Sequence, residues 1–213
     1  MKTFVFFLSF FMVFFCSFPI SAENSPDFII DPGHGGADGG AVGIDGTYEK
    51  DLNLDLSLKL AELFYLADID FVMTRSTDDD TDGDSSSFLK REDIFARVDL
   101  AAKYPSAVFV MIHMNSSTGV NDKGFQVFYG HKSPESEEVA QKISAAVSSS
   151  GLANRMREVK KAPSSVYLTE TVENPAVLVE CGFISNEADN QLLTDEKYRQ
   201  KLALVLLSAL CNG

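Results

Sequence analysis

Hydrophobic residues in this chain form short runs that alternate with longer stretches of helical periodicity. The short runs are rich in β-branched and aromatic residues and predict strands at residues 28–30, 70–74, 107–112, 125–129 and 176–179. Apolar positions at helical spacing predict helices over residues 48–66, 88–103, 135–149 and 195–211. Strands that alternate with helices indicate the α/β fold class: a single domain with a mixed, mostly parallel β-sheet flanked by helices on both faces.

Two of these elements carry further detail. Residues 125–129 alternate between apolar and polar side chains after a glycine-containing loop, which is typical of an edge strand or of an antiparallel hairpin partner. The helix over residues 48–66 has Thr47 as its expected N-cap. The core face of this helix is expected to consist of Leu52, Leu56, Leu60 and Leu63.

The amino terminus differs in composition from the rest of the chain. Lys2 precedes an uncharged and mostly apolar run at residues 4–20, and small residues follow it up to Ala22. This pattern predicts a secretory signal peptide at residues 1–22 and a mature domain at residues 23–213. An uncleaved anchor helix is the alternative, although the run is short for a membrane span and no positive charge follows it directly.

Composition excludes several classes of protein. The chain has 213 residues, of which 45% are hydrophobic and 23% charged, so it can form one domain with a buried core and is not a disordered, collagen or coiled-coil sequence. The 18 Lys and Arg residues against 31 Asp and Glu residues give a net charge of −13. We therefore expect neither a basic surface for nucleic acid nor a polybasic patch for an anionic membrane.

Cysteine usage is sparse. Removal of the signal peptide would leave Cys181 and Cys211 in the mature chain. These two residues could form one disulfide in an oxidising compartment, but they are too few for a disulfide scaffold. Cys181 follows an apolar strand, so a buried free thiol is the alternative.

Polar residues of chemical interest follow three of the predicted strands. His34 comes shortly after the first strand, His113 follows the third, and Glu180 follows the last. Because ligands bind beyond the carboxyl ends of the strands in open α/β sheets, these side chains are expected to converge on one crevice. His34 also lies in a glycine-rich turn, residues 33–40, whose spacing matches neither a dinucleotide-binding loop nor a Walker loop.

Two imidazoles and a nearby carboxylate form the ligand set of catalytic zinc sites that keep a fourth position open for water. His34 and His113 would supply the imidazoles, and the glycine-rich turn leads directly to Glu49, which could otherwise only complement the helix dipole. A second carboxylate is then needed as general base, and spacing alone leaves open whether Glu49 or Glu180 binds the metal. Cys181 is expected to point away from Glu180, on the opposite face of the strand.

An acidic segment offers a different kind of metal site. Asp78, Asp80, Asp82 and Gly83 match the opening of an EF-hand loop. The bidentate glutamate required at the twelfth position is replaced by Leu89. A solvated acidic loop is therefore favoured over a calcium site. The same missing glutamate argues against a calcium-stabilised adhesion module.

Segments across the whole mature chain carry a family resemblance. They are, in order, residues 30–36, residues 40–43, Glu49-Lys50, Asn53-Leu54, Thr74-Arg75, Arg97, residues 113–116, residues 175–180, Gly182-Phe183 and Ser185-Asn186. With these segments the chain resembles the amidase_3 family, the zinc-dependent N-acetylmuramoyl-L-alanine amidases that hydrolyse bacterial cell walls. The resemblance implies that His34, Glu49 and His113 bind one Zn²⁺ ion per chain and that Glu180 is the catalytic glutamate. Residues 23–213 would then be the zinc amidase catalytic domain.

The same resemblance implies a reaction and a set of partners. The implied reaction is hydrolysis of the amide bond between N-acetylmuramic acid and L-Ala of the stem peptide, in peptidoglycan or muropeptides. No membrane partner is expected after removal of the signal peptide. The chain between Gly124 and Glu180 is too short for the long regulatory helix of some family members, so no activator protein is expected to be required. The protein is expected to be exported, with the periplasm favoured over the extracellular space.

Three positions depart from residues that are usual in the family: Ala102, Met111 and Met114. None of them is an implied zinc ligand, so they bear on substrate fit more than on catalysis. The alternatives to the amidase are another zinc-dependent peptidoglycan peptidase that uses the same ligands and a non-catalytic peptidoglycan-binding protein.

Overall fold

Six strands form one mixed sheet in the computed structural model, which describes residues 25–79, 81, 90–119 and 121–211. The strands are β1 (Phe28–Pro32), β2 (Phe71–Met73), β3 (Val108–Asn115), β4 (Gln126–Tyr129), β5 (Lys160–Lys161) and β6 (Ala176–Phe183). Their order across the sheet is β2-β1-β3-β6-β4-β5. β1 pairs in parallel with β2 and β3, β3 with β6, and β4 with β5, whereas β4 and β6 are antiparallel. The predicted mixed, mostly parallel sheet is confirmed.

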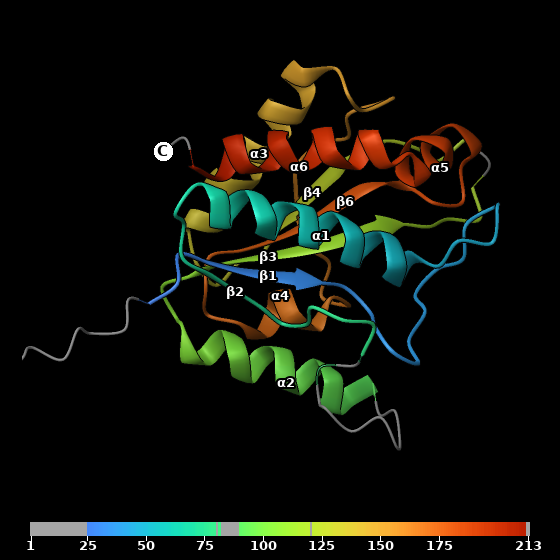
Figure 1. Cartoon of the computed structure of the whole chain (residues 1–213). Coiled ribbons are helices and arrows are strands. Elements are labelled where there is room, and N and C mark those ends of the chain that lie inside the picture. Colours follow the sequence, from blue (N-terminus) through green and yellow to red (C-terminus); the bar gives the residue numbers. More distant parts are fainter. Residues whose placement is uncertain (1–24, 80, 82–89, 120, 212–213) are drawn as a thin grey trace, which may run out of the picture.

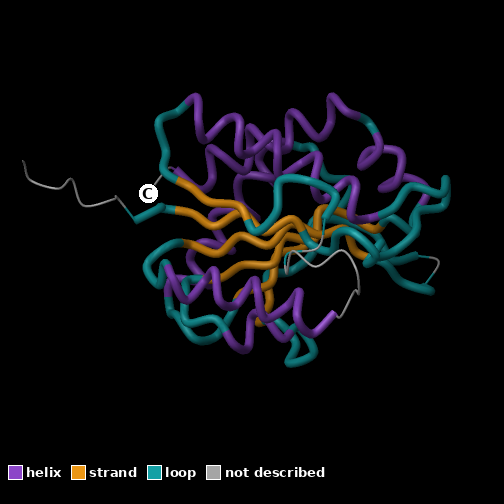
Figure 2. Tube along the Cα trace, turned by 60° about the horizontal axis from the view of Figure 1, so that its bottom comes forward, coloured by secondary structure: helices purple, strands orange, loops and turns teal. Residues whose placement is uncertain are grey.

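Helices cover both faces of this sheet (Figures 1 and 2). They are α1 (Glu49–Leu66), α2 (Lys90–Lys103), α3 (Glu135–Ser150), α4 (Tyr167–Thr171), α5 (Glu187–Thr194) and α6 (Glu196–Cys211). In Figure 1, α1, α5 and α6 lie above the sheet, and α2 and α4 lie below it. α3 packs against α6 and therefore belongs to the upper layer. The fold is a three-layer α/β arrangement, as the sequence pattern predicts.

Alternating side chains of the strands divide the core into two parts. On β3, Met111 packs in the cluster that contains Ala101 of α2, whereas Val110 and Ile112 pack in the cluster that contains Leu56 of α1. β1 and β6 alternate in the same way. This period of two decides which residues at the carboxyl ends of the strands face α2 and which face α1.

The core face of α1 confirms the prediction and extends it. Leu52, Leu56 and Leu60 are buried, and Leu63 is partly buried against the same cluster. Phe64 completes this face with no solvent exposure. Full burial of each leucine contributes about 1.5–3 kcal/mol, so this face fixes the position of the helix, including its first turn.

The predicted N-cap of α1 is wrong. The cap residue is Tyr48, which has an extended backbone and makes no capping hydrogen bond through its side chain. The backbone N–H of Glu49 donates instead to the carbonyl oxygen of Ala41 at 2.9 Å, and that of Lys50 donates to the carbonyl oxygen of Gly39 at 3.2 Å. The glycine-rich loop thus satisfies the first helical N–H groups, and no hydroxyl from Thr47 is needed.

Several elements differ from the sequence-based expectation. β4 pairs antiparallel with β6, but α3, β5 and α4 lie between the two strands in the chain, so β4 is not the predicted hairpin partner. It is not an edge strand either, because β5 pairs with its other side. β3 and β6 both continue past their predicted ends. β5, α4 and α5 were not expected, since elements of 2, 5 and 8 residues are too short to show a clear hydrophobic period.

Two predictions concern residues outside the described part of the chain. The signal peptide at residues 1–22 lies there, and so do Asp80, Asp82, Gly83 and Leu89 of the acidic segment. Within the described residues, Asp78 forms an ion pair with Lys50 at 2.7 Å. None of the described helices combines the length and the apolar character needed to cross a membrane.

The cysteines do not pair in the described structure. Cys181 and Cys211 are both free, the first buried and the second exposed. Cys181 belongs to the cluster on the α1 side of the sheet, two residues from Val179. The alternative of a buried free thiol is confirmed for Cys181, and its side chain points away from the α2 face.

Candidate metal site

Side-chain alternation places two of the predicted site residues in one crevice on the α2 face. His113 lies two residues after Met111 on β3, and Glu180 lies two residues after Leu178 on β6. Each therefore points to the same face of the sheet as that earlier residue, which packs toward α2. His113 and Glu180 are direct partners in the ladder between these two strands. They lie within the strands, not beyond their ends as expected, because the pairing of β3 with β6 runs past both residues.

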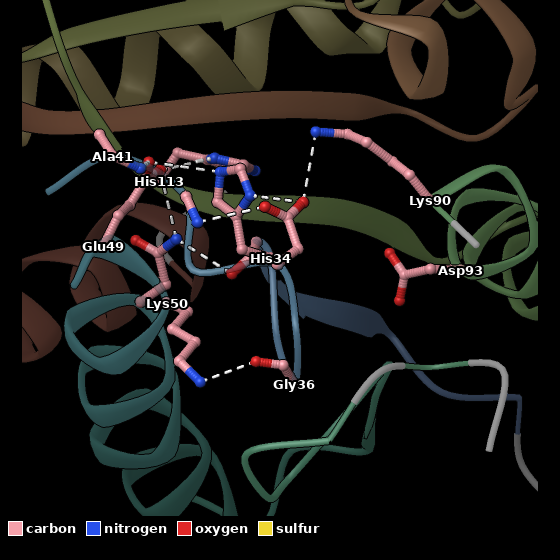
Figure 3. Close-up of polar contacts among 12 residues, drawn as sticks. His34, Gly36, Ala41, Glu49, Lys50, Lys90, Asp93 and His113 are labelled. Atoms are coloured by element: carbon pink, nitrogen blue, oxygen red, sulfur yellow. Dashed lines mark hydrogen bonds and ion pairs between the residues drawn. The ribbon is translucent and has the colours of Figure 1, made fainter. Parts of the chain in front are cut away.

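His34 and Glu49 reach the crevice from the loop after β1 and from the first turn of α1 (Figure 3). His34 adopts a left-handed backbone with φ of 61°, which is uncommon for a residue other than glycine. Its Nε2 lies 3.3 Å from Oε2 of Glu49, whose Oε1 lies 3.0 Å from Nδ1 of His113. One ligand atom from each of the three residues lies within 4.8 Å of the others. The structure therefore brings together the three residues expected to bind metal.

Neighbouring groups fix the orientation of these side chains. The backbone N–H groups of Ala41 and Met114 donate to Oε2 and Oε1 of Glu49, at 2.9 and 3.1 Å. On the far side of the His34 ring, Nδ1 lies 3.0 Å from Oδ2 of Asp38. A carboxylate on one ring nitrogen fixes the tautomer of a histidine and leaves the other nitrogen to bind a metal. Nε2 of His34 is the nitrogen that faces Glu49.

The ionisable groups of the site favour positive charge at its centre. Burial disfavours the charged form of His34, but its hydrogen bonds with Asp38 and Glu49 outweigh burial and raise its pKa to about 9. Burial also opposes ionisation of Glu49, yet its contacts with His113 and His34 hold its pKa well below the usual range. Hydrogen bonding with His34 lowers the pKa of Asp38 in the same way. The carboxylates of Glu49 and Asp38 are thus charged, and one lies on each side of the His34 ring.

Two buried arginines fix the loop that carries His34. Nη2 of Arg97 donates to the carbonyl oxygen of His34 at 2.8 Å, and its guanidinium forms a buried ion pair with Asp31. Nη2 of Arg75 donates to the carbonyl oxygen of Gly33 at 3.0 Å. Both guanidinium groups are committed to backbone carbonyls, which assigns them to the framework of the loop. The sequence alone does not separate this role from substrate binding.

Glu180 contributes to the crevice a carboxyl oxygen that no described protein group binds. Its Oε2 is buried and has no hydrogen-bond partner among the described residues. Burial raises the pKa of Glu180 to about 7, although its electrostatic interaction with His113 partly opposes this effect. A buried carboxyl oxygen without a partner is unusual in a folded protein and is typical of a group that meets a ligand.

A cavity of about 280 Å³ opens beside these residues on the α2 face. His34, His113 and Glu180 line its floor. Its walls come from α2, which contributes Lys90, and from the start of α4, which contributes Tyr167. The volume is close to the lower limit of ordinary ligand pockets, about 300 Å³. The crevice can therefore admit part of a larger molecule, with the reacting bond near the two histidines.

Sequence reasoning missed three residues of this crevice. Asp38 follows His34 by four residues, and a carboxylate close to a candidate histidine ligand is a signal that could have identified it. Lys90 and Tyr167 have no local signal, because only the packing of α2 and α4 brings them to the cavity. The third histidine, His131, is exposed near Glu170, as expected of a surface residue.

Comparisons with known proteins agree with this geometry. The family model described as Amidase_3, N-acetylmuramoyl-L-alanine amidase, matches residues 28–212. The germination-specific N-acetylmuramoyl-L-alanine amidase of Bacillus subtilis (strain 168) is 34% identical over 190 residues, which cover 88% of this chain and 78% of the relative. The fold is similar to that of the CwlD amidase from Clostridioides difficile, solved in complex with the GerS lipoprotein. That similarity has a TM-score of 0.75 with 32% identity and covers 85% of this chain and 94% of the other.

A second solved structure leads to the same family. The N-acetylmuramoyl-L-alanine amidase from Clostridium difficile 630 aligns with a TM-score of 0.76 and 29% identity. The alignment covers 89% of this chain and 100% of that protein. The family match over residues 28–212 includes every described element that contributes to the crevice.

Proposed function

Because this chain belongs to the Amidase_3 family of N-acetylmuramoyl-L-alanine amidases, we propose that His34, Glu49 and His113 bind one zinc ion and that Glu180 is the general base. The enzyme is a peptidoglycan hydrolase, and its reaction is the cleavage of the amide between N-acetylmuramic acid and L-Ala. One observation carries the proposed metal site: a ligand atom from each of the three residues lies within 4.8 Å of the other two.

The donor set fits zinc. Catalytic zinc sites use three nitrogen or oxygen ligands and keep one position open, and two imidazoles with one carboxylate is an established combination. The backbone donors on Glu49 and the carboxylate of Asp38 on His34 hold these ligands in place, as expected of groups that orient metal ligands. Calcium and magnesium prefer oxygen ligands, so two imidazoles disfavour both ions.

Each residue of the crevice has a defined role in this proposal. Zinc, when bound, supplies Lewis-acid chemistry by lowering the pKa of water to about 7 and polarising the substrate carbonyl. The unpartnered Oε2 of Glu180 accepts the proton of the attacking water and then delivers it to the amine of L-Ala. Arg75 and Arg97 hold the loop of His34 rigid, because their donors are bound to its carbonyl oxygens.

We further propose that residues 1–22 direct export and that residues 23–213 form the catalytic domain. The substrate supports this assignment, since peptidoglycan lies outside the cytoplasmic membrane. The composition of residues 1–22 supports it independently. The proposed compartment is the periplasm, and fractionation of cells that make the full chain would test this against secretion into the medium.

Gly33 provides a test of the metal site in which none of the proposed ligand residues is substituted. A Cβ atom at this position would lie 2.1 Å from Nε2 of His113, so Gly33→Ala must displace that ring. We expect affinity for zinc, measured by titration against a chromophoric chelator, to fall about 10–100-fold, as it does when orienting groups are lost. Gly130→Ala is the control, because its φ lies outside the left-handed region and its added Cβ would come no closer than 3.3 Å to another atom. Unchanged affinity in Gly33→Ala would argue against His113 as a ligand.

Activity without an activator protein is a second expected result. The described segment between β4 and β6 holds α3, β5 and α4, and the five-residue α4 lines the wall of the cavity without filling it. We therefore expect the purified protein to solubilise peptidoglycan when zinc is the only addition, and a chelator to stop the reaction. Hydrolysis that begins only after a partner protein is added would contradict this expectation.

A further inference from the structure

Among the described residues that line the cavity beside the proposed zinc site, one lysine is not committed to the fold. Lys90 is the first residue of α2 and lines the cavity wall. Its side chain is 63% exposed, and its Nζ lies 3.3 Å from Oδ2 of Asp38 (Figure 3). The ammonium group therefore extends from the helix toward the metal ligands, while the root of the side chain stays at the rim.

The contact with Asp38 does not prevent the Lys90 ammonium group from binding another anion. Oδ2 of Asp38 already lies 3.0 Å from Nδ1 of His34, and its Oδ1 accepts from the backbone N–H of Gly40 at 3.2 Å. An ion pair with so exposed a lysine contributes little to stability and is easily exchanged for another anion. Asp38 keeps its other partners when Lys90 leaves.

Arg97, the other cation that lines the cavity, cannot take this role. Its side chain is 3% exposed, and its donors are bound to Asp31, Asp93 and backbone carbonyl oxygens. The remaining charged side chains of the described cavity lining, apart from the histidines, are acidic: Asp31, Asp38, Asp93 and Glu180. Lys90 is thus the one lysine or arginine of the described lining that can meet an anionic substrate group.

The surroundings of Lys90 fit a peptide. Ile94, Val166 and Tyr167 form apolar wall next to it. The Tyr167 ring lies 6.1 Å from that of Phe95, and both rings are exposed at this rim. An apolar wall with one charged group that fixes orientation is the usual composition of a ligand pocket. A carboxylate bound there would be partly shielded from water, which strengthens its interaction with an ammonium group.

Distance relates Lys90 to a particular part of the substrate. The path from Nζ of Lys90 to Nε2 of His34 runs through Asp38. It consists of the 3.3 Å contact between Nζ and Oδ2 of Asp38, the 3.0 Å contact between Oδ2 and Nδ1 of His34, and the width of the imidazole ring. About two extended residues span such a distance, at ~3.5 Å per residue. In peptidoglycan the residue after L-Ala is D-Glu, whose α-carboxyl group is free in some cell walls and amidated in others. This carboxyl group is the first anionic group of the stem peptide beyond the scissile amide.

We propose that Lys90 binds the free α-carboxylate of D-Glu in the stem peptide, so that the peptide lies along the α2–α4 side of the cavity and the enzyme prefers substrates that are not amidated. This inference rests on the proposed function of the site. Lys90 is accordingly a residue that determines specificity, and it takes no part in the proton transfers of the reaction.

A comparison of two substrates with three proteins tests this assignment. The substrates are muropeptides that differ only in a free or amidated D-Glu carboxyl group, and the proteins are the unsubstituted enzyme, Lys90→Met and Lys160→Met. Lys160 is an exposed lysine of β5, remote from the described cavity lining, so its variant controls for the loss of one positive charge. We expect Lys90→Met to lower kcat/KM about tenfold on the free carboxylate, mainly through KM, and less than twofold on the amidated substrate. Lys160→Met should alter neither value.

Other outcomes would overturn the assignment. An equal loss on both substrates would mean that Lys90 acts through Asp38 on His34 or supports the fold, and no loss on either would mean that it does not contact the substrate. Lys90→Arg, which keeps the charge, should retain the preference for the free carboxylate. If the unsubstituted enzyme hydrolysed neither muropeptide with zinc present, the proposed function itself would fail, and this inference would fail with it.

Discussion

Replacement of Glu180 by glutamine is expected to slow peptidoglycan hydrolysis by about 10²–10⁴-fold, the contribution usual for a positioned general base, while the protein keeps its zinc. Glutamine has nearly the same shape as glutamate, but its amide oxygen is not basic. Oε2 of Glu180 has no partner among the described residues, so no hydrogen bond within that part of the chain depends on a charge at this oxygen. The three proposed ligands remain in place in this variant.

Two measurements on the same preparation check this result. Turnover is followed by the release of soluble fragments, and zinc content by metal analysis of the dialysed protein. Glu158→Gln serves as the control, because Glu158 is 80% exposed and lies outside the described cavity lining. Should Glu180→Gln lose zinc as readily as a variant of His34, the roles assigned to Glu49 and Glu180 would have to be exchanged or abandoned.

Removal of either histidine is expected to abolish both zinc binding and hydrolysis. His34→Ala and His113→Ala each delete one of three ligands, and two remaining ligands do not hold zinc against a chelator. We expect hydrolysis to fall to the background of the assay, and millimolar zinc to restore little of it. The Glu49 carboxylate, 4% exposed, would also lose a side-chain partner in each variant, so a lower melting temperature is expected as well.

The remaining histidine supplies the matched control. His131 is exposed near Glu170 and lies outside the described cavity lining. His131→Ala should keep full zinc content and full activity. Circular dichroism of all three variants separates loss of metal from loss of fold. Bound zinc at one ion per chain in His34→Ala or His113→Ala would remove that residue from the proposed ligand set.

The sequence predicts the sheet well because its strands are buried on both faces. Continuous apolar runs therefore mark β1, β3 and β6, and their alternation decides that Met111 and His113 share one face while Cys181 faces the other. The expected convergence of the two histidines with Glu49 is confirmed. The ends of β3 and β6 were placed too early, because polar residues at a site do not interrupt the pairing of the backbone.

Other features depend on packing between distant segments and leave no local pattern. The N-terminus of α1 is satisfied by carbonyl oxygens of Ala41 and Gly39, so the usual capping residue is not needed. Lys90 and Tyr167 line the same cavity only because α2 and α4 lie on the same face of the sheet. α5 does carry a signal, because Asn186 caps it through its side chain and lies three residues before Asp189.

If this crevice is a zinc centre that cleaves the amide between N-acetylmuramic acid and L-Ala, the products of digestion will show it. The decisive measurement is mass spectrometry of the products released from peptidoglycan by purified residues 23–213, with zinc and with a chelator. We expect free stem peptides that begin with L-Ala, present with zinc and absent with the chelator. Shortened peptides released while L-Ala stays attached to muramic acid, or products that persist without metal, would contradict it.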